Sequence, residues 1–184
     1  RKKERKKERR KKGRKEGRKE GKKEGRKMRR RKVREDRLVK TREELAGIRE
    51  SGKVNKAVLD AVAEKIGVGM STEEIDEIVY KTTIELRGTP APLHYEGFPK
   101  SVCTSVNNQI CHGIPSRDVI LKSGDIINVD VSTIYKGYFS DSSRMFLIGE
   151  VSEENRRLVQ VAKECVEEGL KMVGPFRSMG SMGA

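Results

Sequence analysis

Residues 123–149, SGDIINVDVSTIYKGYFSDSSRMFLIG, contain the pattern that decides the fold. Two runs rich in Ile, Val, Phe and Tyr flank Lys136-Gly137, which is typical of an antiparallel hairpin that turns near residues 135–137. The aliphatic run at 126–131 nevertheless contains Asp130, and Asp141 follows the turn. An ionised carboxylate in a buried strand is strongly destabilising unless a partner charge or a metal ion compensates it. The two carboxylates therefore need a physical explanation.

The length of the turn decides how the two carboxylates are placed. If Lys136-Gly137 is a two-residue loop, Asp130 lies opposite Ser143 and Ser132 lies opposite Asp141. Diagonal neighbours on one face lie roughly 7 to 8 Å apart at Cα, which lets both carboxylates converge on ions, as in sites with two metals roughly 3.5 to 4 Å apart. A loop one residue longer would place them on opposite faces.

The alternative explanation is that Asp141 begins a turn and that Asp130 pairs with a Lys or Arg. The local sequence favours a metal ion, because no basic residue lies within five positions of Asp130 and the first one after it is Lys136.

His112 lies in QICHGIPS, residues 109–116, after an apolar run and before a Gly and a Pro that force a turn. This context predicts a side chain held near the end of a strand. A general acid or a hydrogen-bond donor to a polarised carbonyl would suit it. The alternative is a packed or surface histidine. His94 has no such context, and we assign it no role.

The remaining patterns predict an α+β fold with the element order ααββββα. Capping boxes at 41–44 and 71–74 predict a first helix over 42–66 and a second from residue 72. Residues 101–114 predict two strands around Asn107-Asn108. Ser152 is expected to cap a third helix, whose apolar stripe includes Cys165 as a core residue.

The N-terminal part of the chain differs in composition from the rest. Residues 1–32 contain 22 Lys or Arg against 5 Glu, with Met28 as their one apolar residue. We therefore expect residues 1–33 to form a Lys/Arg-rich tail that is disordered or a frayed helix, and residues 34–184 to form the domain. The tail would suit RNA phosphates, the ribosome surface or anionic lipid. The alternative is a solvated arm without a specific role.

Composition also bears on cellular location. No run approaches the roughly 20 apolar residues of a membrane span, and no hydrophobic region follows the basic tail to make a secretory signal. A cytoplasmic location is therefore expected. The three cysteines, Cys103, Cys111 and Cys165, are odd in number and lack CxxC spacing, which favours reduced thiols over disulfides.

Two stretches together resemble a type I methionine aminopeptidase. They are HYEGFPKSVCTSVNNQICHGIP, residues 94–115, and the hairpin at 123–149, and the resemblance extends over about residues 40–183. It implies a pita-bread α+β fold in which two divalent metal ions, of Co, Mn, Fe or Zn, support removal of the N-terminal methionine from nascent polypeptides. A complete enzyme of this kind is expected to be a monomer.

The resemblance also implies roles for individual residues. Asp130 of NVDV and Asp141 of FSDSS match the two aspartate ligands of the metal centre. His112 of CHGIP matches the histidine that contacts the scissile amide of the substrate and steadies the tetrahedral intermediate. Three further positions match the lining of the pocket for the methionine side chain: Tyr95, Phe98 and Cys103.

The chain also departs from the family pattern. The family's histidine ligand and both glutamate ligands lie beyond residue 184, so we expect only the first half of the fold, truncated at its C-terminal end, with little hydrolytic activity of its own. Glu96 stands where many members have His.

Two other functions compete with the aminopeptidase. One is a non-catalytic pita-bread module that binds RNA or ribosomes through residues 1–32. The other is a proline-specific aminopeptidase, which the CHGIP segment and the short N-terminal region disfavour.

Overall fold

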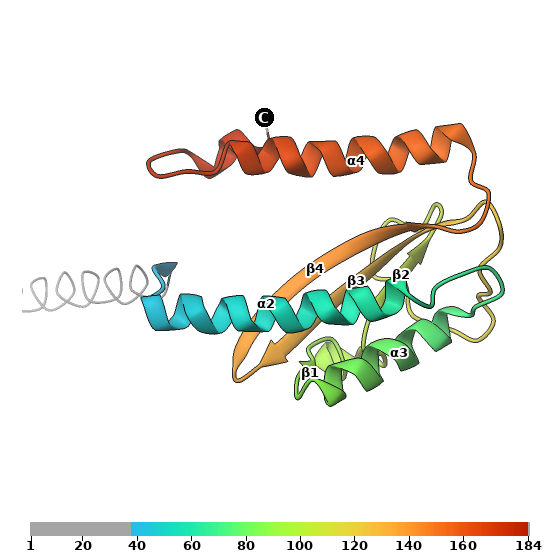
Figure 1. The fold of residues 1–184 in the computed structure, drawn as a ribbon, viewed down its shortest axis with the longest axis horizontal. Helices are drawn as coiled ribbons and strands as arrows, with labels where there is room; N and C mark the ends of the chain where they lie inside the picture. The colour runs from blue at the N-terminus through green and yellow to red at the C-terminus, as the bar shows by residue number, and fades with distance from the viewer. Residues whose placement is uncertain (1–37, 184) are drawn as a thin grey trace, which may run out of the picture. The chain divides into compact units, whose positions relative to one another are not determined.

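The computed structural model of the chain describes residues 38–183, and Figure 1 shows its helices and strands. The predicted basic tail, residues 1–33, lies outside the described residues. The chain divides into two units, residues 1–45 and 46–184, and the second contains the sheet and all predicted site residues. The first two helices are α2, Arg42–Ala63, and α3, Thr72–Glu85.

Both helices begin at the predicted capping boxes. Thr41 Oγ1 accepts a hydrogen bond from Glu44 N at 3.2 Å, and Glu44 Oε2 accepts one from Thr41 N at 2.7 Å. Ser71 and Glu74 make the same reciprocal pair before α3. The end of α2 differs from the prediction, because the chain leaves the helix after Ala63 and not at residue 66. Boundaries of this kind are the least certain part of a sequence-based assignment.

The sheet is antiparallel and is built around β3, Ile126–Tyr135. One edge of β3 pairs with β4, Tyr138–Leu147, and the other pairs with β2, Cys103–Val106, and with the short β1, Thr89–Pro90. Four strands were predicted and residues 38–183 contain four, but they are not the same four.

The prediction of a second strand after Asn107-Asn108 is wrong. Residues 109–114 form no strand, and β2 pairs with β3 instead. The Asn107 side chain explains part of the difference, since Nδ2 donates to Asp125 Oδ1 at 2.8 Å and Oδ1 accepts from Ile126 N at 3.0 Å. These bonds tie the end of β2 to the start of β3.

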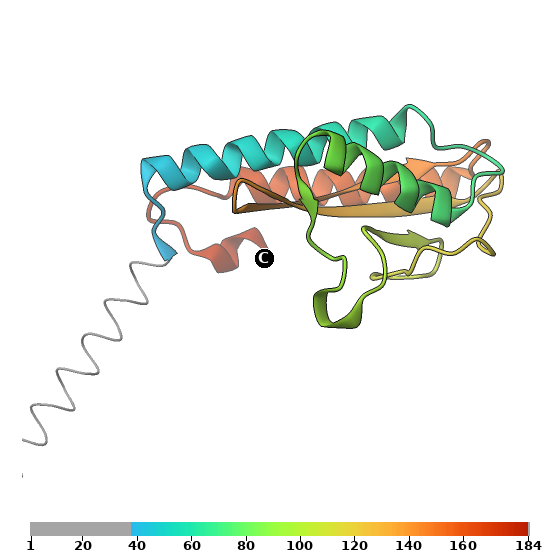
Figure 2. The ribbon, with the colours of Figure 1, turned by 90° about the horizontal axis from the view of Figure 1, so that it is seen from below.

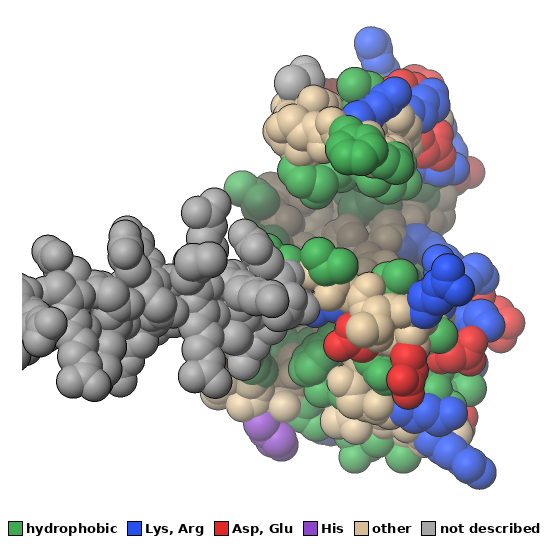
Figure 3. Space-filling model, turned by 90° about the vertical axis from the view of Figure 1, so that its left-hand side faces the viewer, with side chains coloured by type: hydrophobic (Ala, Val, Ile, Leu, Met, Phe, Trp, Pro, Cys, Tyr) green, Lys and Arg blue, Asp and Glu red, His purple; other side chains and the backbone are tan. Residues whose placement is uncertain are grey.

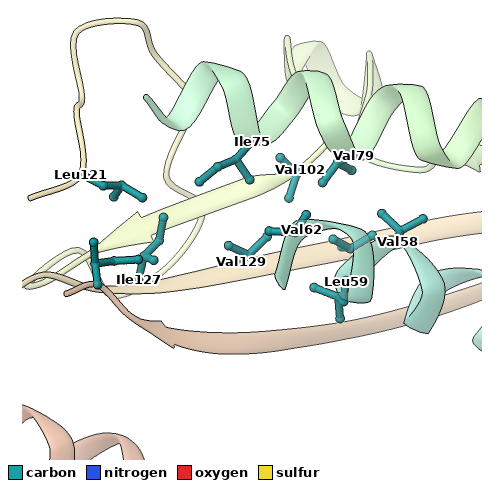
Figure 4. Packing of buried hydrophobic residues seen from close by; sticks show 11 residues of the cluster. Val58, Leu59, Val62, Ile75, Val79, Val102, Leu121, Ile127 and Val129 are labelled. Atoms are coloured by element: carbon teal, nitrogen blue, oxygen red, sulfur yellow. The ribbon is translucent and has the colours of Figure 1, made fainter. Parts of the chain in front are cut away.

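A single apolar core lies between the two helices and one face of the sheet. In β3, Ile127, Val129 and Val131 are fully buried, while the alternate residues over 128–132 are only partly buried, as period-2 alternation requires. Figure 4 shows residues of this cluster: Val58, Leu59 and Val62 from α2, Ile75 and Val79 from α3, Val102, Leu121, and Ile127 and Val129 from β3. The turn that carries η1, Tyr95–Gly97, projects on the side of the sheet away from α2 and α3 (Figure 2).

The last helix, α4, Glu153–Lys171, begins after the predicted cap Ser152. Its apolar stripe is exposed, with Leu158 at 58%, Val166 at 63% and Leu170 at 60% of the reference area. Cys165 is exposed as well, so the prediction that it belongs to the core is wrong for the described structure. Hydrophobic side chains accordingly reach the surface in the upper part of Figure 3, where α4 and the segment containing η2, Met179–Met182, lie.

Among the described residues, no helix combines the length and apolarity that crossing a membrane requires. The three cysteines are free thiols, as predicted.

Candidate metal centre

The β3–β4 hairpin places the two predicted carboxylates on one face. Lys136 (φ 50°) and Gly137 (φ 82°) form a two-residue turn with positive φ at both positions. The register pairs Asp130 with Ser143 and Ser132 with Asp141. The predicted diagonal relation between the carboxylates is therefore confirmed.

The surroundings of Asp130 raise the pKa of its carboxyl. Burial raises the pKa of its carboxyl above the ordinary 3.8, and the charge of Asp141 and side-chain hydrogen bonding with Asp141 raise it further. The nearby His112 lowers the pKa of Asp130 by a smaller amount. Within residues 38–183, neither aspartate forms a salt bridge with Lys or Arg, which removes the main alternative considered for Asp130.

Cys103 lies beside this pair. Residue 103 in β2 is the register partner of Asp130, so the two side chains share the same face of the sheet. Burial raises the pKa of the Cys103 thiol to about 11, with further contributions from Asp130, Cys111 and Asp141. The thiol is therefore neutral at pH 7 and presents a small polarizable surface.

His112 is held in a left-handed conformation with φ 54°. The residue after it, Gly113, accepts a hydrogen bond from Thr104 N at 2.8 Å and donates one to Ser105 Oγ at 3.3 Å. Residues 109–114 form no strand, so the prediction that His112 lies at the end of one is wrong, and these bonds to β2 hold the turn instead. They leave the imidazole facing the same cavity as the carboxylates.

That cavity has a volume of about 850 Å³, within the usual range for small-ligand sites. It brings together every predicted site residue: Tyr95, Phe98, Cys103, His112, Asp130 and Asp141. Its wall also contains Glu96, and none of the Lys and Arg residues within 38–183 lines it. His94, to which no role was assigned, does not line it. The cavity therefore joins an apolar section to an acidic one.

The donors present suit a divalent cation. Two carboxylates lie on one face, and burial together with the charge of Asp141 raises the pKa of Asp130. A bound cation would relieve both effects, and oxygen ligands suit several divalent metals. In residues 38–183, however, no three His, Cys, Asp or Glu side chains are grouped in a way that would hold a metal ion. The pair supplies only part of a coordination shell.

A partly buried ionic cluster supports the cavity wall and was not predicted. Lys100 Nζ donates to both carboxylate oxygens of Glu73, and Ser101 N donates to Asp76 Oδ1 at 2.6 Å. These bonds connect α3 to the segment that carries Phe98. Burial raises the pKa of Asp76, while the bond from Ser101 and the charge of Lys100 lower it.

The polar residues of α2 that contact the hairpin were also missed. Ser51 is fully buried and Asn55 is 1% exposed. A usable signal was present, because positions 48, 51, 55, 58, 59 and 62 share one face of an α-helix. A polar residue on the buried face of a helix usually has a specific partner.

Comparisons with known proteins agree with this geometry. The profile of Metallopeptidase family M24 matches residues 46–184. The chain belongs to this family. It is 44% identical over 145 residues to "Methionine aminopeptidase 1D, mitochondrial" of Danio rerio, covering 79% of this chain and 43% of the relative. It is 45% identical over 147 residues to "Methionine aminopeptidase 1A" of Arabidopsis thaliana, covering 78% and 37%.

A solved structure shows the same fold. The methionine aminopeptidase of Rickettsia prowazekii superposes with a TM-score of 0.69 at 37% identity, covering 71% of this chain and 52% of that chain. The predicted resemblance to methionine aminopeptidases and the predicted pita-bread α+β fold are both confirmed. The chain spans only about half the length of the solved structure and less than half of the two curated relatives.

Proposed function

We propose that this chain contributes part of the active site of an aminopeptidase that removes the N-terminal methionine from newly made polypeptides. The observation that carries the proposal is the pair Asp130 and Asp141, which has no basic partner in the described residues and adjoins an apolar section of one cavity. A thioether-accepting pocket beside a cation site is the combination that this reaction needs.

In this proposal Asp130 and Asp141 hold two divalent ions, of Co, Mn, Fe or Zn, together with ligands that the described residues do not supply. Ions bound there lower the pKa of water and polarise the scissile carbonyl. His112 donates a hydrogen bond to the scissile amide and stabilises the charge that develops on it. Three side chains receive the methionine side chain: Tyr95, Phe98 and Cys103.

Two carboxylates cannot define the geometry of two ions. A stable site for a divalent transition metal usually has at least three protein ligands. We therefore expect the 184-residue chain to bind metal weakly and to hydrolyse substrate slowly or not at all. The described residues do not supply the remaining ligands.

The proposed partners follow from the same function. The substrate is the N-terminus of a nascent polypeptide, in the cytoplasm. Residues 1–32, with 22 basic side chains, would bind the ribosome or RNA through phosphate contacts. The complete enzyme is proposed to act as a monomer.

The experiment that tests the proposal is hydrolysis of Met-Ala-Ser with added Co²⁺ or Mn²⁺. The 184-residue chain is compared with the polypeptide of the complete reading frame, and an Asp130→Asn variant of the latter is the control. We expect activity only in the complete polypeptide, its loss after treatment with EDTA, and its absence in the variant. Family-level activity of the 184-residue chain would contradict the proposed division of the site, and no activity in either would favour a non-catalytic module that binds RNA or ribosomes through residues 1–32.

A further inference from the structure

Asn55 is a polar side chain buried in an apolar neighbourhood. It is 1% exposed and lies on the face of α2 that also carries Val58, Leu59 and Val62. Figures 1 and 2 show α2 running along β3 and β4, and the hydrogen bonds of Asn55 cross this interface. A buried amide without partners would be costly, so its partners indicate what the position requires.

The partners of Asn55 lie on both strands of the hairpin. Nδ2 donates to the backbone oxygen of Val131 in β3 at 2.6 Å. Oδ1 accepts a hydrogen bond from the hydroxyl of Ser142 in β4. Val131 and Ser142 are register partners, so one side chain connects a pair of residues that face each other across the two strands.

These contacts are immediate neighbours of both candidate metal ligands. Val131 follows Asp130 directly, and Ser142 follows Asp141 directly. Nδ2 also lies 3.5 Å from the backbone oxygen of Ser140, on the other side of Asp141. Asn55 thus bonds to the backbone oxygen of Val131, next to Asp130, and to that of Ser140, next to Asp141. On the other side of Asp141 it bonds to the side chain of Ser142.

Because of strand geometry, these contacts constrain the positions of the two carboxylates. Successive side chains point to opposite faces of a sheet. Asn55 bonds to the hairpin from the helix side, and it therefore constrains where the carboxylates lie on the cavity side. We infer that Asn55 is a positioning residue that fixes the spacing of Asp130 and Asp141 for a divalent cation. The inference rests on the proposed function in taking these two side chains as metal ligands.

The test measures Mn²⁺ binding to the 184-residue chain by electron paramagnetic resonance, together with the thermal unfolding midpoint of the metal-free chain. Asn55→Leu keeps the size of the side chain and removes every hydrogen bond to the hairpin. It should weaken Mn²⁺ binding about 10-fold, the lower end of the effect of residues that orient metal ligands. Ser142→Ala removes only the bond from the Ser142 hydroxyl and should weaken binding about 3-fold, because the bonds of Asn55 to the backbone oxygens of Val131 and Ser140 remain.

Thr83→Val is the matched control. Thr83 is fully buried on α3, and its hydroxyl donates to Val79 O within the same helix at 2.6 Å, so the variant removes a buried hydrogen bond without touching β3 or β4. It should lower the unfolding midpoint and leave the Mn²⁺ dissociation constant unchanged, measured well below that midpoint. The same pattern in Asn55→Leu would show a purely structural role and overturn the inference.

Other outcomes are equally decisive. If Asn55→Leu does not fold, unchanged Mn²⁺ affinity in Ser142→Ala overturns the inference by itself. A wild-type chain that binds no Mn²⁺ at millimolar concentration, or binds it independently of Asp130, also overturns it. The proposed function is judged separately, by Met-Ala-Ser hydrolysis in the complete polypeptide.

Discussion

The two faces of the β3–β4 hairpin differ in what they contribute. The face toward α2 and α3 contains Ile127, Val129 and Val131, all fully buried. The opposite face contains Asp130 and Asp141 at the wall of a cavity. The same strands thus present an apolar face that stabilises the fold and an acidic face that destabilises it. The proposed cation site on the acidic face accounts for this difference.

The largest expected effect comes from truncating the apolar face. Ile127→Ala should lower the free energy of unfolding by about 2 to 5 kcal/mol, because it leaves a cavity in a packed core. Equilibrium unfolding in urea measures this loss. A loss below about 1 kcal/mol would mean that the core does not stabilise this face.

The second-largest effect is expected at the turn of the hairpin, which both faces share. Gly137 has φ 82°, a conformation that costs a residue with a Cβ roughly 1 to 2 kcal/mol. Gly137→Ala should destabilise the chain by about that amount in urea unfolding. Gly52→Ala, in the middle of α2 where an added Cβ meets nothing within 4 Å, is the control and should be neutral or stabilising.

Neutralising the acidic face should raise the stability of the metal-free chain, whereas the two preceding changes lower it. Asp130→Asn removes the repulsion from Asp141, and it should raise the thermal midpoint of the metal-free chain by about 2 to 4 °C, the shift that 1 kcal/mol produces at this length. The same variant should lose Mn²⁺ binding. A lower midpoint would show that the Asp130 carboxylate stabilises the fold and would weaken the contrast between the faces.

The pH dependence of stability sharpens the same contrast. Because the pKa of Asp130 in the folded chain is raised above 3.8, the folded state binds the proton more tightly than the unfolded state. Its contribution is favourable below pH 3.8 and is lost as the pH rises through the raised pKa. The pKa of Asp76 is raised in the same direction, so the difference between wild type and Asp130→Asn in urea unfolding at several pH values isolates Asp130. We expect the wild type to lose more stability than the variant as the pH rises through this window, and parallel curves would contradict it.

The smallest effect is expected for an apolar residue of the cavity face. Phe139 is 65% exposed, and Phe139→Ser should change the free energy of unfolding by no more than about 0.5 kcal/mol, as at most surface positions. Urea unfolding beside Ile127→Ala compares one apolar residue from each face. A loss similar to that of Ile127→Ala would remove the distinction between the faces.

Local sequence signals predicted much of this structure. The capping residues Ser71 and Ser152 marked helix starts because their hydrogen bonds involve only the next few residues. The two-residue turn at Lys136-Gly137 fixed the register and, with it, the shared face of Asp130 and Asp141.

Features that depend on distant partners were harder to predict. The apolar stripe around Cys165 predicted the helix correctly. Its burial would require a second surface to pack against it, and the stripe of α4 is exposed in the described structure. The strand expected after Asn108 is absent, because β2 forms its ladder with β3, which lies farther along the chain, and residues 109–114 form no ladder with it. Asn55 gave no local signal of its partners in β3 and β4, which lie far along the chain.

Gly113 limits which substitutions this protein can accept during evolution. A Cβ built at this position would lie 1.9 Å from the carbonyl oxygen of Thr104, a backbone atom that cannot move aside cheaply. Every amino-acid replacement of a glycine adds that carbon, so every missense mutation of this codon displaces the turn that carries His112. Substitutions in this segment are therefore expected at positions other than Gly113. As long as Gly113 is kept, the imidazole of His112 keeps its position.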